Sequence, residues 1–201
     1  IQNINPQVYY TRRWDFKTGI CRLEQVNTSL DVSSNVAQAH LNINYRNNFE
    51  RYEGDPFDDR WGMNVNFDAR PLDQIGLGFY GGIGRNVYYD YEIGDDLYFR
   101  FVGRDGYQTS YGGFLDLKPI DRLTIEPNFN YQRMSDPATG QRFYGGYITR
   151  TRMQFQATKA LSIRLVVQYN DFRKNWDVDP LLTYRLNPFT VFYLGSSVDY
   201  G

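Results

Sequence analysis

Apolar and polar residues alternate with a two-residue period over most of the chain. One such run extends from Trp61 to Ala69, and a second run extends from Ile75 to Ile83. Because successive side chains of a β-strand point to opposite faces of the sheet, each run predicts a strand with one apolar and one polar face. The runs reach about ten residues, which is the length that a tilted strand needs to cross a lipid bilayer.

We expect about eleven antiparallel strands and no helix, because no apolar stripe with a helical period and capping residues occurs. The expected strands cover residues 6–17, 19–31, 36–50, 57–69, 74–88, 106–118, 121–133, 142–157, 160–172, 176–186 and 190–199. Single-chain bacterial barrels have even numbers of strands, so an odd number leaves at least one strand missing. The sequence therefore predicts one all-β domain over residues 1–201. We interpret it as an up-and-down transmembrane β-barrel, in the form of a C-terminal fragment that lacks the last strand.

The expected connections fall into two classes that alternate from the third strand onwards. Short connections contain proline or lysine, at residues 70–73, 118–121, 158–160 and 187–189, whereas longer polar connections cover residues 48–59, 89–105, 135–142 and 171–177. By the same parity, residues 17–19 form a short outer turn and residues 32–36 a periplasmic one. Outer-membrane barrels have short periplasmic turns and long extracellular loops, so the alternation favours that class.

The composition favours an apolar face that meets lipid. The chain has 18 Tyr, 14 Phe and 3 Trp, yet its mean hydropathy is −0.60. A barrel with a wet lumen and aromatic girdles at both membrane interfaces has this composition, because its polar residues face water. The alternative is a soluble β-sandwich, for which we expect more Val, Leu and Ile at the core.

Bulk properties exclude several classes of protein. The net charge of −1 gives no electrostatic case for nucleic acid, and the single Cys21 allows neither a disulfide framework nor a thiol metal site. No stretch of about eighteen apolar residues predicts a membrane-spanning helix. The chain starts at Ile1 without a signal peptide, although export to an outer membrane requires one. We therefore expect a mature product or a piece of a longer chain.

Two segments near the C-terminus, Arg152–Phe172 and Asp179–Gly195, are specific enough to indicate a family. They resemble the C-terminal barrel of large outer-membrane proteins of Bacteroidota and related phyla. Those proteins carry an N-terminal carbohydrate-binding, family-nine-like domain before a barrel of unknown function. Members usually have Pro-Gly-Thr-Val where this chain has Pro188-Phe189-Thr190-Val191, and their aromatic last strand and sugar-binding domain do not occur here. The resemblance implies a location and an architecture, and it supplies no catalytic residue.

Five charged residues on the polar faces of expected strands are candidates for the lumen. They are Asp116, Glu126, Arg150, Arg152 and Arg164. A ring of mixed charge could set the ion selectivity of a pore. The same residues could form a ladder of salt bridges between strands or a seat for a plug. We favour the ladder, because both signs of charge occur together.

Seven aromatic residues are expected in the interfacial girdles or the outer loops. They are Trp61, Tyr88, Tyr89, Tyr91, Tyr131, Trp176 and Tyr184. For the cluster of Tyr88, Tyr89 and Tyr91, an alternative is a platform that binds sugars by stacking, but a girdle and loop packing explain these residues without a ligand. Gly76, Gly78, Gly82 and Gly84 share one face of an expected strand. There they leave room for a bulky neighbour against the lumen wall.

His40, the single histidine, shares a polar face with Gln38, Asn42 and Asn44. A catalytic base needs a nucleophile or an acid within hydrogen-bond reach, and no sequence motif links His40 to the serines at positions 29, 33 and 34. We interpret it as a polar residue of the lumen. We expect neither a cofactor nor an enzymatic activity.

The leading hypothesis is a pore, transport or surface-anchoring barrel in a Gram-negative outer membrane, in contact with the lipid bilayer and lipopolysaccharide and linked to carbohydrate handling. The alternative is a plugged barrel that acts as a scaffold for lipoproteins or other subunits of an outer-membrane complex. A third hypothesis is an outer-membrane hydrolase that uses His40. Conductance would favour the first, a co-purifying subunit the second, and an activity lost in His40→Ala the third.

Overall fold

The computed structural model describes residues 1–52, 55–93 and 99–200, and these ranges form a single antiparallel sheet of twelve strands with one short 3-10 turn, η1 (Val36–Gln38). The strands are β1 (Asn3–Trp14), β2 (Cys21–Ser34), β3 (Ala39–Tyr52), β4 (Asp55–Leu72), β5 (Ile75–Ile93), β6 (Phe99–Ile120), β7 (Leu123–Ser135), β8 (Arg142–Gln156), β9 (Leu161–Asn170), β10 (Asn175–Asn187), β11 (Thr190–Gly195) and β12 (Val198–Tyr200). In the described ranges, no helix has the length and hydropathy to cross a membrane.

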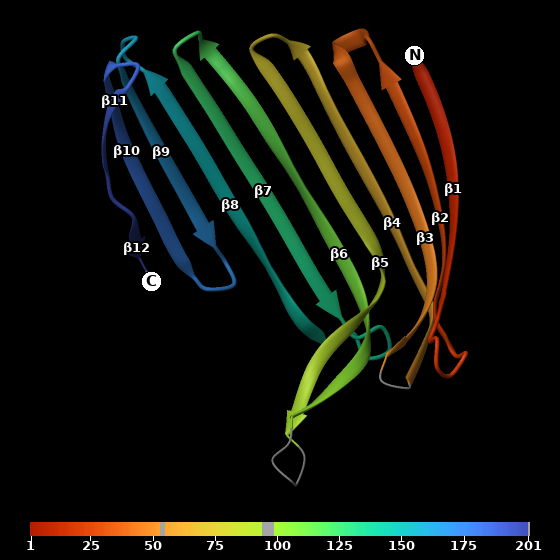
Figure 1. Cartoon of the computed structure of the whole chain (residues 1–201). Coiled ribbons are helices and arrows are strands. Elements are labelled where there is room, and N and C mark those ends of the chain that lie inside the picture. The colour runs from red at the N-terminus through yellow and green to blue at the C-terminus, as the bar shows by residue number, and fades with distance from the viewer. Residues whose placement is uncertain (53–54, 94–98, 201) are drawn as a thin grey trace.

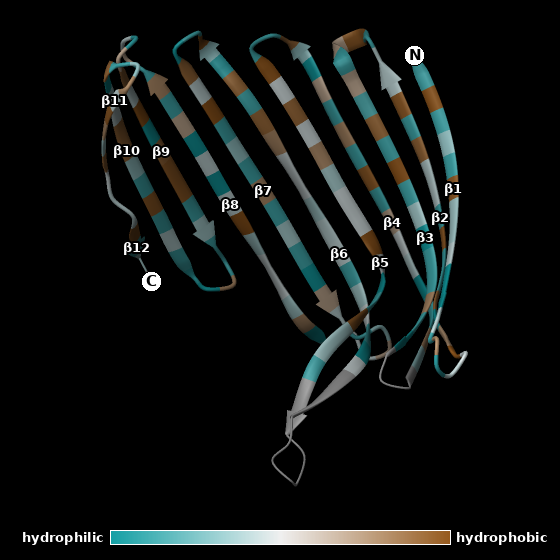
Figure 2. Cartoon of the chain, in the orientation of Figure 1, coloured by the Kyte–Doolittle hydropathy of each residue, from teal (hydrophilic) through white to brown (hydrophobic). Residues whose placement is uncertain are grey.

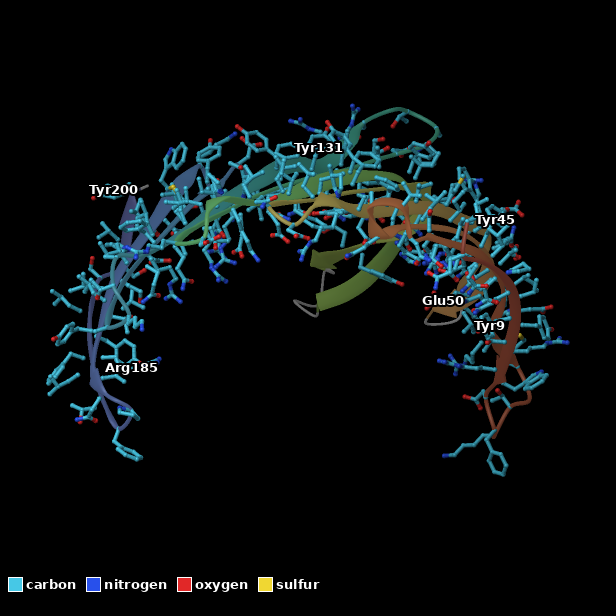
Figure 3. The ribbon with its side chains drawn as sticks, turned by 90° about the horizontal axis from the view of Figure 1, so that it is seen from above. Tyr9, Tyr45, Glu50, Tyr131, Arg185 and Tyr200 are labelled. Atoms are coloured by element: carbon cyan, nitrogen blue, oxygen red, sulfur yellow. The ribbon has the colours of Figure 1, made fainter. Side chains whose placement is uncertain are left out.

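Each strand from β1 to β11 pairs with its neighbours in sequence, so the sheet has the expected all-β, up-and-down topology (Figure 1). The sheet is strongly curved, and its cross-section is an arc when it is seen from above (Figure 3). Over the described residues β1 and β11 are edge strands that do not pair with each other, so the arc is open.

The last expected strand, residues 190–199, is wrong as a continuous element. β11 ends at Gly195 and β12 begins at Val198, and both pair with β10. At the break, the backbone N–H of Ser196 donates to the carbonyl of Pro180 at 3.3 Å, and the Ser197 hydroxyl donates to Asp179. These two serines give β10 alternative hydrogen-bond partners, and the ladder is interrupted there.

Two of the expected long loops are instead extensions of strands. β5 continues to Ile93 and β6 starts at Phe99, with a continuous register that includes Tyr89 opposite Gly103. Likewise β3 continues to Tyr52 and β4 starts at Asp55. Backbone hydrogen bonds between strands form whether the side chains are polar or apolar. The strand boundaries expected from polar sequence were therefore wrong at these two places. Residues 53–54 and 94–98 lie outside the described ranges.

The short connections at the opposite end are confirmed, and the two that contain Pro71 and Pro119 are shorter than expected. Pro71 belongs to the end of β4 and Pro119 to the end of β6, so two-residue turns follow at Asp73 and Asp121. The register shifts beside both prolines. A proline has no N–H to donate to the ladder, which explains why it lies at an irregularity near the end of a strand.

Three turns at the other end share one geometry. Their first residues are Asp15, Asp136 and Asn170, whose side-chain oxygens accept backbone N–H groups two and three residues later at 2.7–3.3 Å. The fifth residue has a positive φ in each turn: +67° at Gly19, +72° at Gly140 and 59° at Lys174. A shared sequence, Asp-x-x-Thr-Gly, marks the first two of these turns.

The sheet buries almost none of its apolar side chains. Among the described residues the buried hydrophobic ones are Val87, Met134 and Val166, whereas Phe79 is 53% exposed and Leu194 is 73% exposed. Hydrophobic and hydrophilic residues alternate along the strands (Figure 2), which agrees with the predicted two-residue period. The apolar face therefore has no packed core against it in the described chain.

Candidate functional site

The concave face of the sheet carries the polar side chains. The side chains of Glu50 and Arg185 point to the concave side of the arc, whereas those of Tyr45 and Tyr131 point to the convex side (Figure 3). Because paired residues on adjacent strands share a face, the register extends this assignment to the rest of each strand. The polar face is therefore concave and continuous, and we treat it as the candidate site.

Amide side chains connect neighbouring strands on this face. The Asn66 amide donates to the Asn42 oxygen at 3.3 Å, and the Asn42 amide donates to Asp31 at 2.7 Å. Farther along β3, the Asn44 amide donates to the oxygen of Asn27 on β2 at 2.9 Å. These hydrogen bonds satisfy polar groups within the sheet and leave the rest of each side chain in contact with water.

All five charged residues expected in the lumen lie on this concave face, by register with the residues above. Arg152 Nε lies 3.1 Å from Glu126 Oε2, directly across β7 and β8. Asp116 Oδ2 lies 3.5 Å from an Arg70 nitrogen at the end of β4. Within the described chain, Arg150 and Arg164 form no ion pair. The expected salt-bridge ladder is therefore present in part, and two of the three arginines keep their charge free.

The hairpin of β5 and β6 bends out of the wall and lies on the concave side of the arc (Figure 3). The ring of Tyr88 on β5 stacks on that of Phe143 on β8, with centroids 4.5 Å apart, although β6 and β7 separate these strands in the sheet. On the other side, a Cβ on Gly103 would lie 2.6 Å from the Phe57 ring of β4. Aromatic contacts therefore hold the bent hairpin from both sides.

A buried arginine lies at the base of the hairpin. Arg60 is 6% exposed, and its guanidinium pairs with Glu50 on β3 and donates to the Asn86 oxygen on β5. The Asn86 amide then donates to Gln108 on β6 at 3.2 Å. A register irregularity in β4, where Asp59 has a φ of 53°, precedes Arg60. The network thus connects four strands where the hairpin leaves the wall.

His40 lies between two carboxylates on the concave face. Its Nδ1 is 3.4 Å from Asp68 Oδ1, and its Nε2 is 3.6 Å from Asp31 Oδ1. Ser33 is opposite His40 in the register of β2 and β3, but the described contacts include no hydrogen bond between the Ser33 hydroxyl and the imidazole. The arrangement is that of a polar cluster, and its geometry does not pair a nucleophile with a base.

A belt of aromatic rings crosses the convex face. Tyr111 and Tyr131 are stacked with centroids 4.8 Å apart. The belt continues over β8, β9 and β10, with centroids 5.6 Å apart between Tyr147 and Tyr169 and 4.9 Å apart between Tyr169 and Trp176. Aromatic side chains gather in this way at membrane–water interfaces.

The other expected aromatic residues have different positions. Trp61 contacts Tyr107 edge to face, with centroids 6.4 Å apart. Tyr89 and Tyr184 are exposed, whereas the side chain of Tyr91 lies outside the described part. Tyr88 packs in the hairpin on the concave face, so it belongs to the loop-packing interpretation rather than to a girdle.

Sequence reasoning missed the Arg60 network and two concave rings, Tyr80 and Phe114. Arg60 lies in the expected strand 57–69, but nothing in the local pattern shows that Glu50 and Asn86 meet its guanidinium. For the two rings the signal was present, because glycines lie beside them on the same face. Within the described residues, no group of three or more His, Cys, Asp or Glu side chains could hold a metal ion.

Comparison with known protein families and with curated protein sequences found no match.

Proposed function

We propose that the chain forms the wall of a transmembrane β-barrel in the outer membrane of a Gram-negative bacterium. The apolar convex face contacts the lipid bilayer and lipopolysaccharide, and the polar concave face lines a water-filled lumen. One observation carries the proposal: a curved antiparallel sheet exposes its apolar side chains, such as Phe79 and Leu194, with almost no core. An apolar surface of this extent marks contact with lipid or protein.

The curvature and the strand lengths support lipid rather than a second protein layer. The alternating run of β5 from Ile75 to Ile83 covers about nine residues, which matches a tilted membrane-spanning strand. In lipid, an unpaired strand edge leaves backbone N–H and C=O groups without partners, so membrane sheets close. Closure requires that β1 and β11 pair with further strands or with each other. The resemblance to Bacteroidota barrels agrees with this architecture.

We infer a pore, transport or anchoring role without catalysis. The concave face carries mixed charge, including Arg150 and Arg164, which form no ion pair among the described residues, and a polar lining of this kind suits a selective aqueous path. The His40 cluster lacks a hydrogen-bonded nucleophile in the described contacts, so we do not assign it a reaction. Abolition of a lipase or protease activity by His40→Ala would contradict this inference.

The bent hairpin favours a second candidate function, a plugged barrel that serves as a scaffold. Tyr88 and Phe143 hold the hairpin across the concave face, and Arg60 stabilises its base. In a closed barrel, a hairpin on the concave side would narrow the aqueous path. The plugged scaffold predicts a co-purifying lipoprotein or other outer-membrane subunit and no conductance.

The first experiment is heat modifiability of the full-length native protein in detergent. Closed outer-membrane barrels resist unfolding in detergent and migrate anomalously on a gel until they are boiled. We expect a clear shift on boiling and partition of the protein into the membrane fraction. A protein that is soluble without detergent and shows no shift would reject the barrel. Conductance in a planar bilayer then separates the pore from the plugged scaffold.

A further inference from the structure

Two aromatic rings lie among the polar side chains of the concave face. Tyr80 on β5 is opposite Gly112 on β6, and Phe114 on β6 is opposite Gly78 on β5. A Cβ on Gly78 would lie 2.2 Å from Phe114 Cε1, and a Cβ on Gly112 would lie 2.6 Å from Tyr80 Cε2. Each ring therefore leans across the neighbouring strand, in the space that a side chain would fill.

Amide groups surround the two rings. Asn66 is opposite Tyr80 on β4, and Asn128 is opposite Phe114 on β7. The Tyr80 hydroxyl donates to Asn130, and the Asn130 amide donates to Asn128. These bonds fix the positions of one ring and two amides. They leave the Asn66 oxygen and the Asn128 amide group for other partners.

Two hollows lie on the concave face, and Phe114 lines the first of them. One has a volume of about 430 Å³ and is lined by Phe114, Asp116, Glu126, Asn128 and Arg150 among others. The other has a volume of about 230 Å³, and Asn64, Ser110 and Gln108 contribute to it. In the described structure Arg150 is exposed and forms no ion pair, so its guanidinium is available to a ligand.

We propose that Tyr80 and Phe114 form a stacking platform for a saccharide inside the lumen. This inference rests on the proposed function, because it requires that the concave face line a water-filled space. A sugar ring has an apolar C–H face that stacks on an aromatic ring, and a rim of hydroxyls that both donate and accept hydrogen bonds. Asn66, Asn128 and Arg150 supply the complementary groups around the platform.

The mixed polarity around the rings selects this class of ligand. Asp116 and Glu126 accept hydrogen bonds, whereas Arg150 and the amides donate them, and the two carboxylates are already paired with arginines. A strongly charged ligand that one of these groups attracts would be repelled by a neighbouring group that has the same sign of charge as the ligand. Neutral hydroxyl groups can donate hydrogen bonds to the carboxylates and accept them from Arg150 and the amides. An acidic group on the sugar could in addition pair with Arg150.

The experiment measures saccharide binding by calorimetry with the full-length protein in a detergent that has no sugar headgroup. The probes are maltohexaose and cellohexaose, which are neutral, and an oligogalacturonate, which is acidic. We expect at least one of them to bind, and we expect Phe114→Ala and Tyr80→Ala each to weaken binding about tenfold. Tyr80→Phe retains the ring and should retain most of the affinity.

The matched control is Phe129→Ala, which removes a ring from the opposite face of the adjacent strand and should leave binding unchanged. If Phe114→Ala does not fold, the exposed substitution Arg150→Gln tests whether the polar groups around the platform contribute to saccharide binding. A loss of affinity for oligogalacturonate alone would identify the ligand as an acidic sugar. Absence of binding by every probe would overturn the inference, as would binding that Phe114→Ala leaves intact. If a protein sample that binds no saccharide still shows the heat-induced shift on a gel, the saccharide inference is wrong and the barrel proposal stands.

Discussion

Single residues determine the three turns that share an Asx first position. The fifth residue of each turn has a left-handed conformation, which costs a residue with a Cβ about 1–2 kcal/mol relative to glycine. Gly19 and Gly140 meet this requirement, whereas Lys174 does not. Lys174 forms an exposed ion pair with Asp171, and exposed pairs of this kind stabilise a protein little.

We therefore predict that Lys174→Gly raises the free energy of unfolding by roughly 1 kcal/mol, because relief of backbone strain exceeds the lost ion pair. Urea titration of tryptophan fluorescence in detergent measures the change. Lys174→Ala is the control, since it removes the same ion pair and keeps the strained conformation. Equal stability of the two variants would show that the positive φ carries no cost here.

The first residue of a turn gives a pH-dependent prediction. Backbone N–H groups of Thr18 and Lys17, together with Arg22, lower the pKa of Asp15 from 3.8 to about 2. A carboxyl group with a lowered pKa stabilises the fold at pH values above its unfolded pKa, and this contribution is lost as the pH falls through the folded pKa. Backbone hydrogen bonds also lower the pKa of Asp136.

We expect the wild type to lose stability between about pH 4 and pH 2, and we expect Asp15→Asn to lose less over the same interval. The measurement is the urea midpoint as a function of pH. Asp136→Asn should behave similarly, because it has the same turn geometry. An identical pH profile for wild type and Asp15→Asn would contradict the assignment.

At the scale of elements, the β5–β6 hairpin depends on the buried Arg60. The Arg60 guanidinium is buried, whereas the Glu50 side chain is 33% exposed, so the carboxylate left without Arg60 would be partly hydrated. We predict that Arg60→Ala destabilises the protein by about 2 kcal/mol, in the range for a lost hydrogen bond to a charged group. Arg60→Lys should recover only part of this loss, because a single ammonium does not reproduce the planar contacts to both Glu50 and Asn86.

Arg46 provides the control for Arg60. It lies on the same concave face but is exposed, so Arg46→Ala should change the free energy of unfolding by less than about 0.5 kcal/mol. Both variants are compared by urea titration in the same detergent. Equal effects at positions 46 and 60 would indicate that the network does not stabilise the base of the hairpin.

The accuracy of the sequence prediction differs among elements for physical reasons. β7 was predicted to within a few residues, because its alternation is regular and a tight turn precedes it. The far ends of β5 and β6 were missed, since polar side chains there hide a ladder that depends only on the backbone. The break between β11 and β12 was missed as well, because it follows from serine contacts with β10 rather than from hydrophobic pattern.

At the scale of the whole molecule, the hydrophobic pattern predicted which residues share a face of the sheet. It did not predict side-chain contacts between strands that are not neighbours. The position of Glu126 opposite Arg152 follows from strand register, which a two-residue period constrains once the turns are known. The stacking of Tyr88 on Phe143 joins strands that are not neighbours, and no local pattern contains that information. The contact of Arg60 with Glu50 is likewise absent from the pattern, because the register of β3 and β4 shifts between these two residues.

The assignment of the convex face to lipid gives the last prediction. Phe67 and Asn66 are neighbours in β4 and belong to opposite faces, convex and concave respectively. In a background where Trp14, Trp61 and Trp176 are replaced by Phe, we compare Phe67→Trp with Asn66→Trp in liposomes. Brominated acyl chains quench tryptophan fluorescence on contact, and aqueous iodide quenches tryptophan that is exposed to water.

We expect brominated lipid to quench the tryptophan at position 67 strongly and that at position 66 weakly, with the reverse order for iodide. Adjacent residues have the same depth along the strand, so a difference between them reports the face and not the distance from the membrane surface. A soluble sandwich would bury position 67 in protein, and neither lipid nor iodide would then reach it. Quenching of both positions by lipid would instead mean that the sheet lies flat on the bilayer and encloses no lumen.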